Sequence, residues 1–184
     1  MRRQIFVTFS LYLILLAVAA WLLPARAADK GGPPMRIDAQ GVAKPLFTGC
    51  YGQVGAGGIF ASGNDTIKGF VIGAGCDWQV GAIVIGANGK YALYGDDTRA
   101  LTVGGRLGYA INPHTLAYVH VGALMDGRDI SLNQSAIMGG VGLEAYFTRN
   151  MTVFIEAATD VKKWGEFREL PQVYEIHGGV RIRF

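Results

Sequence analysis

The chain ends with the sequence VYEIHGGVRIRF at Val173–Phe184, in which apolar and charged side chains alternate. Successive side chains of a β-strand point to opposite faces, so this stretch predicts a strand with one apolar and one charged face. Ile182 and Phe184 fall on the apolar face, and Arg181 and Arg183 fall on the charged face. A membrane barrel turns such apolar residues to lipid and polar residues to the lumen. We therefore expect this stretch to be a strand of a transmembrane barrel.

Residues Met1–Ala27 have the features of a signal peptide. Two arginines precede the unbroken apolar run Ile5–Leu23, and Ala25–Ala27 supplies the small residues that a signal peptidase recognises. We predict cleavage before Ala28, followed by a flexible leader over residues 28–46. The alternative is an uncleaved membrane anchor, since the apolar run is long enough to span a bilayer.

The composition of the exported part is that of a neutral all-β protein. Removal of the signal peptide takes away three of the 17 Lys and Arg residues, and the remaining 14 equal the 14 Asp and Glu residues. A nucleic-acid partner therefore has no electrostatic support. The 27 glycines and the 11% aromatic content favour closely packed strands over helices.

From Gly49 onward, the chain divides into eight alternating stretches of the length that a tilted transmembrane strand needs. The predicted strands are Gly49–Phe60, Lys68–Trp78, Ala82–Tyr94, Arg99–Ala110, Thr115–Met125, Ser135–Phe147, Met151–Asp160 and Val173–Phe184. Tight turns alternate with longer, more charged connections, which is typical of outer-membrane barrels. The sequence thus predicts an eight-stranded antiparallel up-and-down barrel over residues 47–184.

Aromatic residues lie beside the predicted tight turns and are expected to face lipid. They are Trp78, Tyr109, Phe147 and Phe184. Aromatic residues gather at membrane interfaces, so these four predict one aromatic girdle.

Five stretches together resemble the small eight-stranded outer-membrane barrels of the porin family and the outer-membrane protein A-like group. They are TGCYGQVGAG at 48–57, residues 69–95, residues 104–122, residues 139–157 and the terminal GGVRIRF. The resemblance implies a transmembrane β-barrel in the bacterial outer membrane, surrounded by lipid and lipopolysaccharide. Members of this group are structural proteins, small-solute channels or surface adhesins. We expect a mainly structural envelope role, with the porin and adhesin roles as alternatives.

The end of the chain also resembles the signal that directs outer-membrane barrels to the barrel-assembly machinery. Gly179, Ile182 and Phe184 carry this resemblance. It implies that the last strand is read during membrane insertion.

Charged residues decide which face of each strand turns to the lumen, because a Lys or Arg near the middle of a bilayer costs about 2–4 kcal/mol. This rule turns Asp77 inward, and it also places inside five charged side chains that are close enough to interact. They are Lys90, Arg106, Glu144, Glu156 and Arg181. We expect a charge-assisted polar network that fills the narrow bore, and the alternative is a selectivity ring that lines a pore.

The sequence offers little support for catalysis. His120 and His177 are expected to face the lumen, away from any acyl chain, and His114 falls in a turn. No phosphate loop or zinc-ligand spacing occurs, so we expect neither an enzyme nor a cofactor. The segment Val161–Gln172 mixes charges with aromatics, and it is either a solvated loop or a contact for a host or surface ligand.

Cys50 and Cys76 are the two cysteines of the chain. In a hairpin centred near Gly63 they lie directly opposite each other, and both belong to the outward faces of their strands. An exported chain meets an oxidising compartment, so the pattern favours a disulfide. The alternative is two free thiols that serve as small lipid-facing residues.

Overall fold

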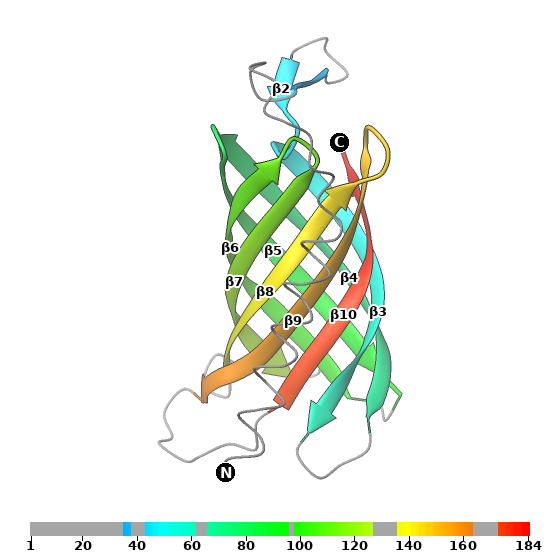
Figure 1. The fold of residues 1–184 in the computed structure, drawn as a ribbon. Helices are drawn as coiled ribbons and strands as arrows, with labels where there is room; N and C mark the ends of the chain where they lie inside the picture. The colour runs from blue at the N-terminus through cyan, green and yellow to red at the C-terminus, as the bar shows by residue number, and fades with distance from the viewer. Residues whose placement is uncertain (1–34, 38–42, 62–65, 96–97, 127–135, 164–172) are drawn as a thin grey trace. The chain divides into compact units, whose positions relative to one another are not determined.

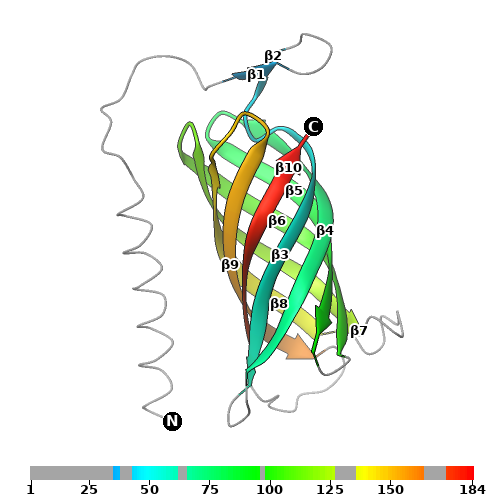
Figure 2. The ribbon, with the colours of Figure 1, turned by 90° about the vertical axis from the view of Figure 1, so that its right-hand side faces the viewer.

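A computed structural model describes residues 35–37, 43–61, 66–95, 98–126, 136–163 and 173–184 of the chain. Eight long strands form one closed antiparallel barrel in the order β10-β3-β4-β5-β6-β7-β8-β9 (Figures 1 and 2). Their bounds are Gly49–Ala61 (β3), Ile67–Val80 (β4), Ile83–Tyr94 (β5), Arg99–Asn112 (β6), Thr115–Asp126 (β7), Ala136–Tyr146 (β8), Met151–Lys163 (β9) and Val173–Arg183 (β10). The predicted fold class is confirmed, and each predicted strand overlaps an observed one.

The register of the strands sets the tilt of the barrel wall. A row of paired residues that starts at Cys50 and crosses all eight strands returns to β3 at Phe60, ten residues further along. With a rise of about 3.3 Å per residue and about 4.8 Å between strands, this shift tilts the strands by about 40° from the barrel axis. Each row of paired residues therefore shifts along the barrel axis, away from the end with the tight turns, as it passes from β3 to β6.

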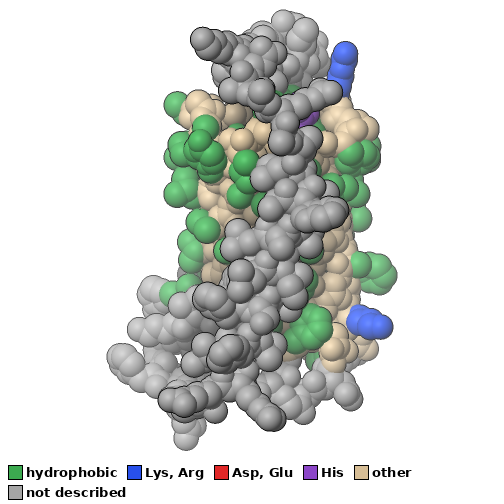
Figure 3. Space-filling view, in the orientation of Figure 1, with side chains coloured by type: hydrophobic (Ala, Val, Ile, Leu, Met, Phe, Trp, Pro, Cys, Tyr) green, Lys and Arg blue, Asp and Glu red, His purple; other side chains and the backbone are tan. Residues whose placement is uncertain are grey.

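The outer face of the barrel is apolar. Phe70, Ile72 and Trp78 alternate along β4 as exposed residues, and Ile83 and Ile85 do the same on β5. Where described side chains are visible in Figure 3, hydrophobic residues are spread over the wall, Lys and Arg lie only near its ends, and no Asp or Glu is seen. This is the inverse of a soluble protein and matches a wall in contact with lipid. In the described part of the chain, no helix has the length and apolarity to cross a membrane.

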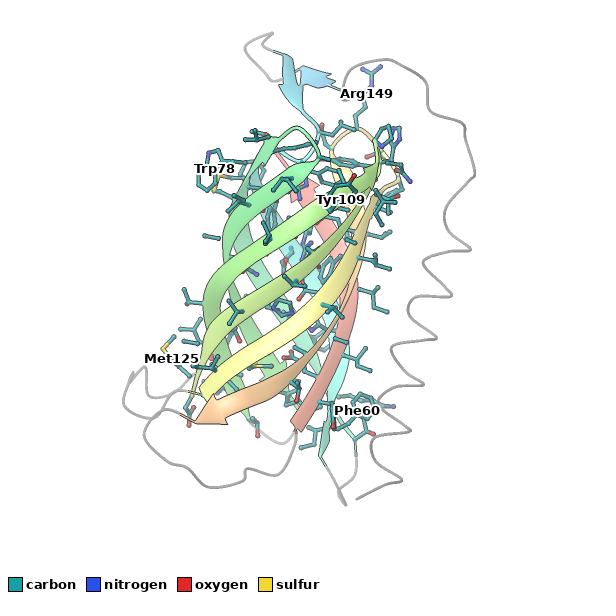
Figure 4. The ribbon with its side chains drawn as sticks, turned by 60° about the vertical axis from the view of Figure 1, so that its left-hand side comes forward. Phe60, Trp78, Tyr109, Met125 and Arg149 are labelled. Atoms are coloured by element: carbon teal, nitrogen blue, oxygen red, sulfur yellow. A yellow bond between two sulfur atoms is a disulfide. The ribbon has the colours of Figure 1, made fainter. Side chains whose placement is uncertain are left out.

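Aromatic residues mark both ends of this apolar wall. Figure 4 shows Trp78 and Tyr109 at the end that carries the tight turn with Arg149, and Phe60 at the opposite end. Trp78 and Phe70 lie eight residues apart on β4, which corresponds to a height of about 20 Å for a strand tilted by about 40°. That height is close to the apolar band of about 25 Å in known barrels.

Part of the segment predicted as a flexible leader is described in the structure. Its described residues form two paired three-residue strands, Met35–Ile37 (β1) and Ala43–Pro45 (β2). The residues directly after β2 belong to the barrel core, because Leu46 and Phe47 are buried in one cluster with Val84. The predicted signal peptide lies outside the described residues.

Candidate functional site

The barrel lumen contains eight buried charged side chains in the part of the chain that the structure describes. The cations are Lys90, Arg106, Arg181 and Arg183, and the anions are Asp77, Glu144, Glu156 and Glu175. Four positive charges therefore face four negative charges. Buried charges are costly unless they are paired and hydrogen-bonded, so this balance allows the interior to be both polar and filled.

Glu144 on β8 is the first centre of the network, because three arginines contact its carboxylate. Arg106 Nη1 donates to Oε2 at 2.9 Å, Arg183 Nη2 donates to Oε1 at 2.6 Å, and Arg181 Nη1 also donates to Oε2. Arg106 and Arg183 extend the network to Asp77, with Arg106 Nε donating to Oδ1 at 2.8 Å and Arg183 Nη1 lying 2.9 Å from Oδ2. One carboxylate thus joins arginines from β6 and β10.

Glu156 on β9 is the second centre. It accepts hydrogen bonds from Lys90 Nζ at 2.7 Å and from the Tyr118 hydroxyl at 2.7 Å. Arg181 donates to Glu156 through Nη2 and to Glu144 through Nη1, so its guanidinium joins the two centres. The planar guanidinium, with donors in a fixed fork, suits such a bridge better than an ammonium group.

Tyrosine rings fill the space between the guanidinium groups. The Cζ atom of Arg106 lies 5.0 Å from the ring centroid of Tyr51 and 4.8 Å from that of Tyr118. Glycines on neighbouring strands make room for these rings. A Cβ atom on Gly75 would lie 2.6 Å from the Tyr51 hydroxyl oxygen, and one on Gly142 would lie 2.4 Å from Cζ of Tyr118. The charges are therefore packed against aromatic faces, with favourable cation–π geometry.

Residues before β3 close the lumen at the end that carries the tight turns. The Phe47 side chain has no exposed surface and packs against Tyr146, with ring centroids 5.2 Å apart. Arg183 Nη1 donates to the Phe47 carbonyl oxygen at 3.2 Å, and the Phe47 N–H donates to Gln79 Oε1 at 3.0 Å. The Tyr146 hydroxyl donates to the carbonyl oxygen of Leu46. Phe47 is thus a plug held by both side-chain and backbone contacts.

The half of the lumen away from the tight turns contains a smaller cluster of polar side chains. His177 Nε2 lies 2.9 Å from Glu156 Oε2, and Glu175 accepts a hydrogen bond from the Tyr94 hydroxyl at 2.8 Å. His120 on β7 is also buried in the lumen, and its Nε2 atom has no hydrogen-bond partner among the described residues. Both histidines face the lumen, as their strand positions predict.

All five residues expected in the lumenal network lie together in the structure. Asp77 and Arg183 belong to this network as well. The sequence pattern placed both on inward faces, but the predicted network did not include them. Sequence reasoning also missed the Phe47 plug.

His114 is exposed in the turn after β6, where its N–H donates to Asn112 Oδ1 at 2.8 Å. Among the described side chains, no group of three or more His, Cys, Asp or Glu residues is placed to hold a metal ion. The side chains of Val161–Gln172 lie outside the described residues.

The two cysteines are bonded on the outer face. Cys50 and Cys76 are direct partners in the register of β3 and β4, and their sulfur atoms lie 2.02 Å apart. The predicted hairpin register is therefore the observed one.

Comparisons with known proteins show a shared fold. No protein-family model matches the chain, and no curated protein matches it. A de novo designed transmembrane β-barrel superposes with a TM-score of 0.53 at 17% identity, covering 74% of this chain and 97% of that one. Neisserial surface protein A gives a TM-score of 0.49 at 17% identity, covering 74% of this chain and 98% of that one. Ail, the attachment invasion locus protein of Yersinia pestis, gives 0.47 at 12% identity, covering 74% and 97%. The first match shows that the chain has the fold of a small transmembrane β-barrel.

Proposed function

We propose that this chain is an integral protein of the bacterial outer membrane with a mainly structural role in the envelope. The apolar wall and its two aromatic ends support insertion in a membrane. Surrounding lipid and lipopolysaccharide are then its main partners, and the barrel-assembly machinery reads β10 during insertion.

The closed lumen is the observation that carries the structural role. Glu144 is contacted by three arginines, and Phe47 covers the same end of the bore without any exposed surface. An eight-stranded barrel has an interior just wide enough for side chains to fill. A solute that crossed this lumen would have to displace Phe47 and separate buried ion pairs. Separation of a buried ion pair strongly destabilises a protein, because it leaves a buried charge without a partner.

Planar-bilayer recording of the purified mature protein tests this role. We expect no stepwise conductance from the wild type. A variant with Phe47→Ala, Arg181→Ala and Glu144→Ala removes the plug and part of the network, so it serves as the positive control and should show channel openings. Stable stepwise conductance of the wild type, together with normal heat-modifiable migration, would replace the structural role with that of a small-solute porin.

Cell fractionation tests the location separately. The protein is expected in the outer-membrane fraction, in a form that resists protease until it is heated. Recovery in the inner membrane would overturn the proposed location and leave the fold unchanged.

A further inference from the structure

The outer wall of the barrel has a hollow of about 660 Å³ that crosses neighbouring strands. Its floor is formed by Gly52, Ala74 and Gly89, which are consecutive partners in the register of β3, β4 and β5. Ile72 and Tyr91, which pair directly with each other, form one wall. Strands β10, β3 and β4 run side by side across this face in Figure 2. The volume is in the range of about 300–1,000 Å³ that small-ligand pockets have.

The packing of the barrel does not require glycine in this floor. A Cβ atom on Gly52 would meet nothing within 4 Å, and one on Gly89 would meet only the Thr102 carbonyl oxygen at 3.9 Å. By contrast, a Cβ atom on Gly104 would lie 2.1 Å from the Val121 carbonyl oxygen. Glycine within a strand costs roughly 0.5–1 kcal/mol relative to alanine. Gly52 and Gly89 therefore keep the hollow open at a cost to strand stability.

The floor of the hollow fits within the depth of one leaflet of a membrane. Its row of paired residues runs from Ile182 on β10 through Gly52 and Ala74 to Gly89 on β5, which is three strand spacings or about 14 Å. Because paired rows shift away from the tight turns as they pass from β10 to β5, a strand tilt of about 40° gives this path a rise of about 9 Å. Half of a bilayer's hydrocarbon core is about 15 Å thick. The floor thus begins two residues from Phe184, on the side of the tight turns, and rises by less than the depth of one leaflet.

A second copy of the chain would fill this surface poorly. A two-fold dimer brings the same patch of each subunit together, so two hollows would face each other and leave a void. Protein interfaces and interiors are closely packed, and such a void would forfeit contacts. A slender, flexible and apolar occupant suits the hollow better.

We propose that one acyl chain of a phospholipid from the turn-side leaflet lies in this hollow. This inference rests on the proposed membrane location. The floor of Gly52, Ala74 and Gly89 receives the chain, while Tyr91 and Phe184 contact its sides.

Native mass spectrometry of barrels extracted from phosphatidylethanolamine and phosphatidylglycerol vesicles tests the site. We expect one retained phospholipid on the wild type and about tenfold less on Gly89→Leu or Gly52→Leu, because leucine occupies the same space. Ala87→Leu is the matched control, because Ala87 is exposed on the outer face of β5 and does not line the hollow. It should retain lipid as the wild type does.

Heat-modifiable migration identifies folded samples, and the two leucine variants serve as replacements for each other if one fails to fold. Equal lipid retention by the folded leucine variants would overturn the site, and so would detergent adducts in place of phospholipid. A lipid-free dimer that Gly89→Leu abolishes would assign the hollow to self-association. Fractionation of cells decides the membrane location independently of these results.

Discussion

The backbone N–H of Phe184 donates a hydrogen bond to the carbonyl oxygen of Cys50 at 3.1 Å. This bond continues the pairing of β10 with β3, which ends at Arg183 and Tyr51. The strands that lie furthest apart in the barrel sequence therefore meet next to the disulfide. Closure of the barrel brings together a covalently fixed hairpin, β3 and β4, and the strand that we propose carries the insertion signal.

Deletion of Phe184 is expected to impair assembly more than the loss of one lipid-facing side chain explains. The deletion removes the hydrogen bond to Cys50, an aromatic side chain that is 74% exposed, and the end of the proposed insertion signal. Outer-membrane levels of the heat-modifiable barrel provide the measurement. Phe147→Ala is the control, since it removes a girdle aromatic but leaves β10 intact. Equal, near-normal levels of both variants would contradict a special role for Phe184.

Arg106→Ala is expected to destabilise the barrel, because Asp77 and Glu144 lose a buried partner. Breaking a buried ion pair costs about 3–5 kcal/mol, and the remaining arginines at Glu144 should keep the loss near the lower value. A second change, Glu144→Gln, should restore part of it. Urea unfolding in lipid vesicles, followed by tryptophan fluorescence, gives the free energies of unfolding.

The same cycle with Glu156→Gln is the control for that coupling. Glu156 is contacted by Lys90, Tyr118, Arg181 and His177, and its links to Arg106 pass through Arg181 and Tyr118. We therefore expect a coupling energy with Arg106 well below that of Glu144. Strictly additive losses in both cycles would show that these groups do not interact.

The strands and their facing were predictable because both follow from periodicity two. Asp77, Arg106 and Glu156 each mark the lumenal face of a strand, since an ionised side chain is costly in lipid. The partner choices inside the lumen were not predictable in the same way. Arg106 pairs with His120 in the sheet register, yet its charge partners Asp77 and Glu144 come from β4 and β8. Those contacts depend on the width and shear of the closed barrel.

The Phe47 plug shows a second limit of the sequence pattern. Phe47 precedes the first long strand and belongs to no alternating run, so its burial follows from the path of the chain back into the barrel mouth. Its backbone contacts are with Gln79 and Arg183, which lie 32 and 136 residues further along the chain. No local periodicity contains that information.

Phe47→Ala is expected to lower the free energy of unfolding by about 3–5 kcal/mol, the usual cost of removing a buried aromatic ring. The planar bilayer should remain silent, because the Glu144 network still fills the bore below it. Phe60→Ala, on the exposed face of β3, is the control and should cost much less. A Phe47→Ala variant as stable as the wild type would show that the plug does not support the barrel.

The Cys50–Cys76 disulfide is expected to stabilise the first hairpin of the barrel. It closes a stretch with a sequence separation of 26. The chain-entropy account of such a loop gives about 3.5 kcal/mol. The bond also holds β3 and β4 in the register that places Gly52 opposite Ala74 and leaves Cys50 beside Phe184. Replacement of both cysteines by serine should therefore lower stability without changing the fold.

The state of the two sulfur atoms can be read directly in protein taken from the outer membrane. Alkylation of the denatured protein without reductant, followed by mass spectrometry, should label neither Cys50 nor Cys76, and prior reduction should allow both to be labelled. Cys76→Ser is the control, because its single remaining thiol at Cys50 must accept the label. Two labelled cysteines without reductant would establish free thiols at the outer face. The stability lost in the double serine variant would then have to come from side-chain packing, since no cross-link would exist to restrict the unfolded chain.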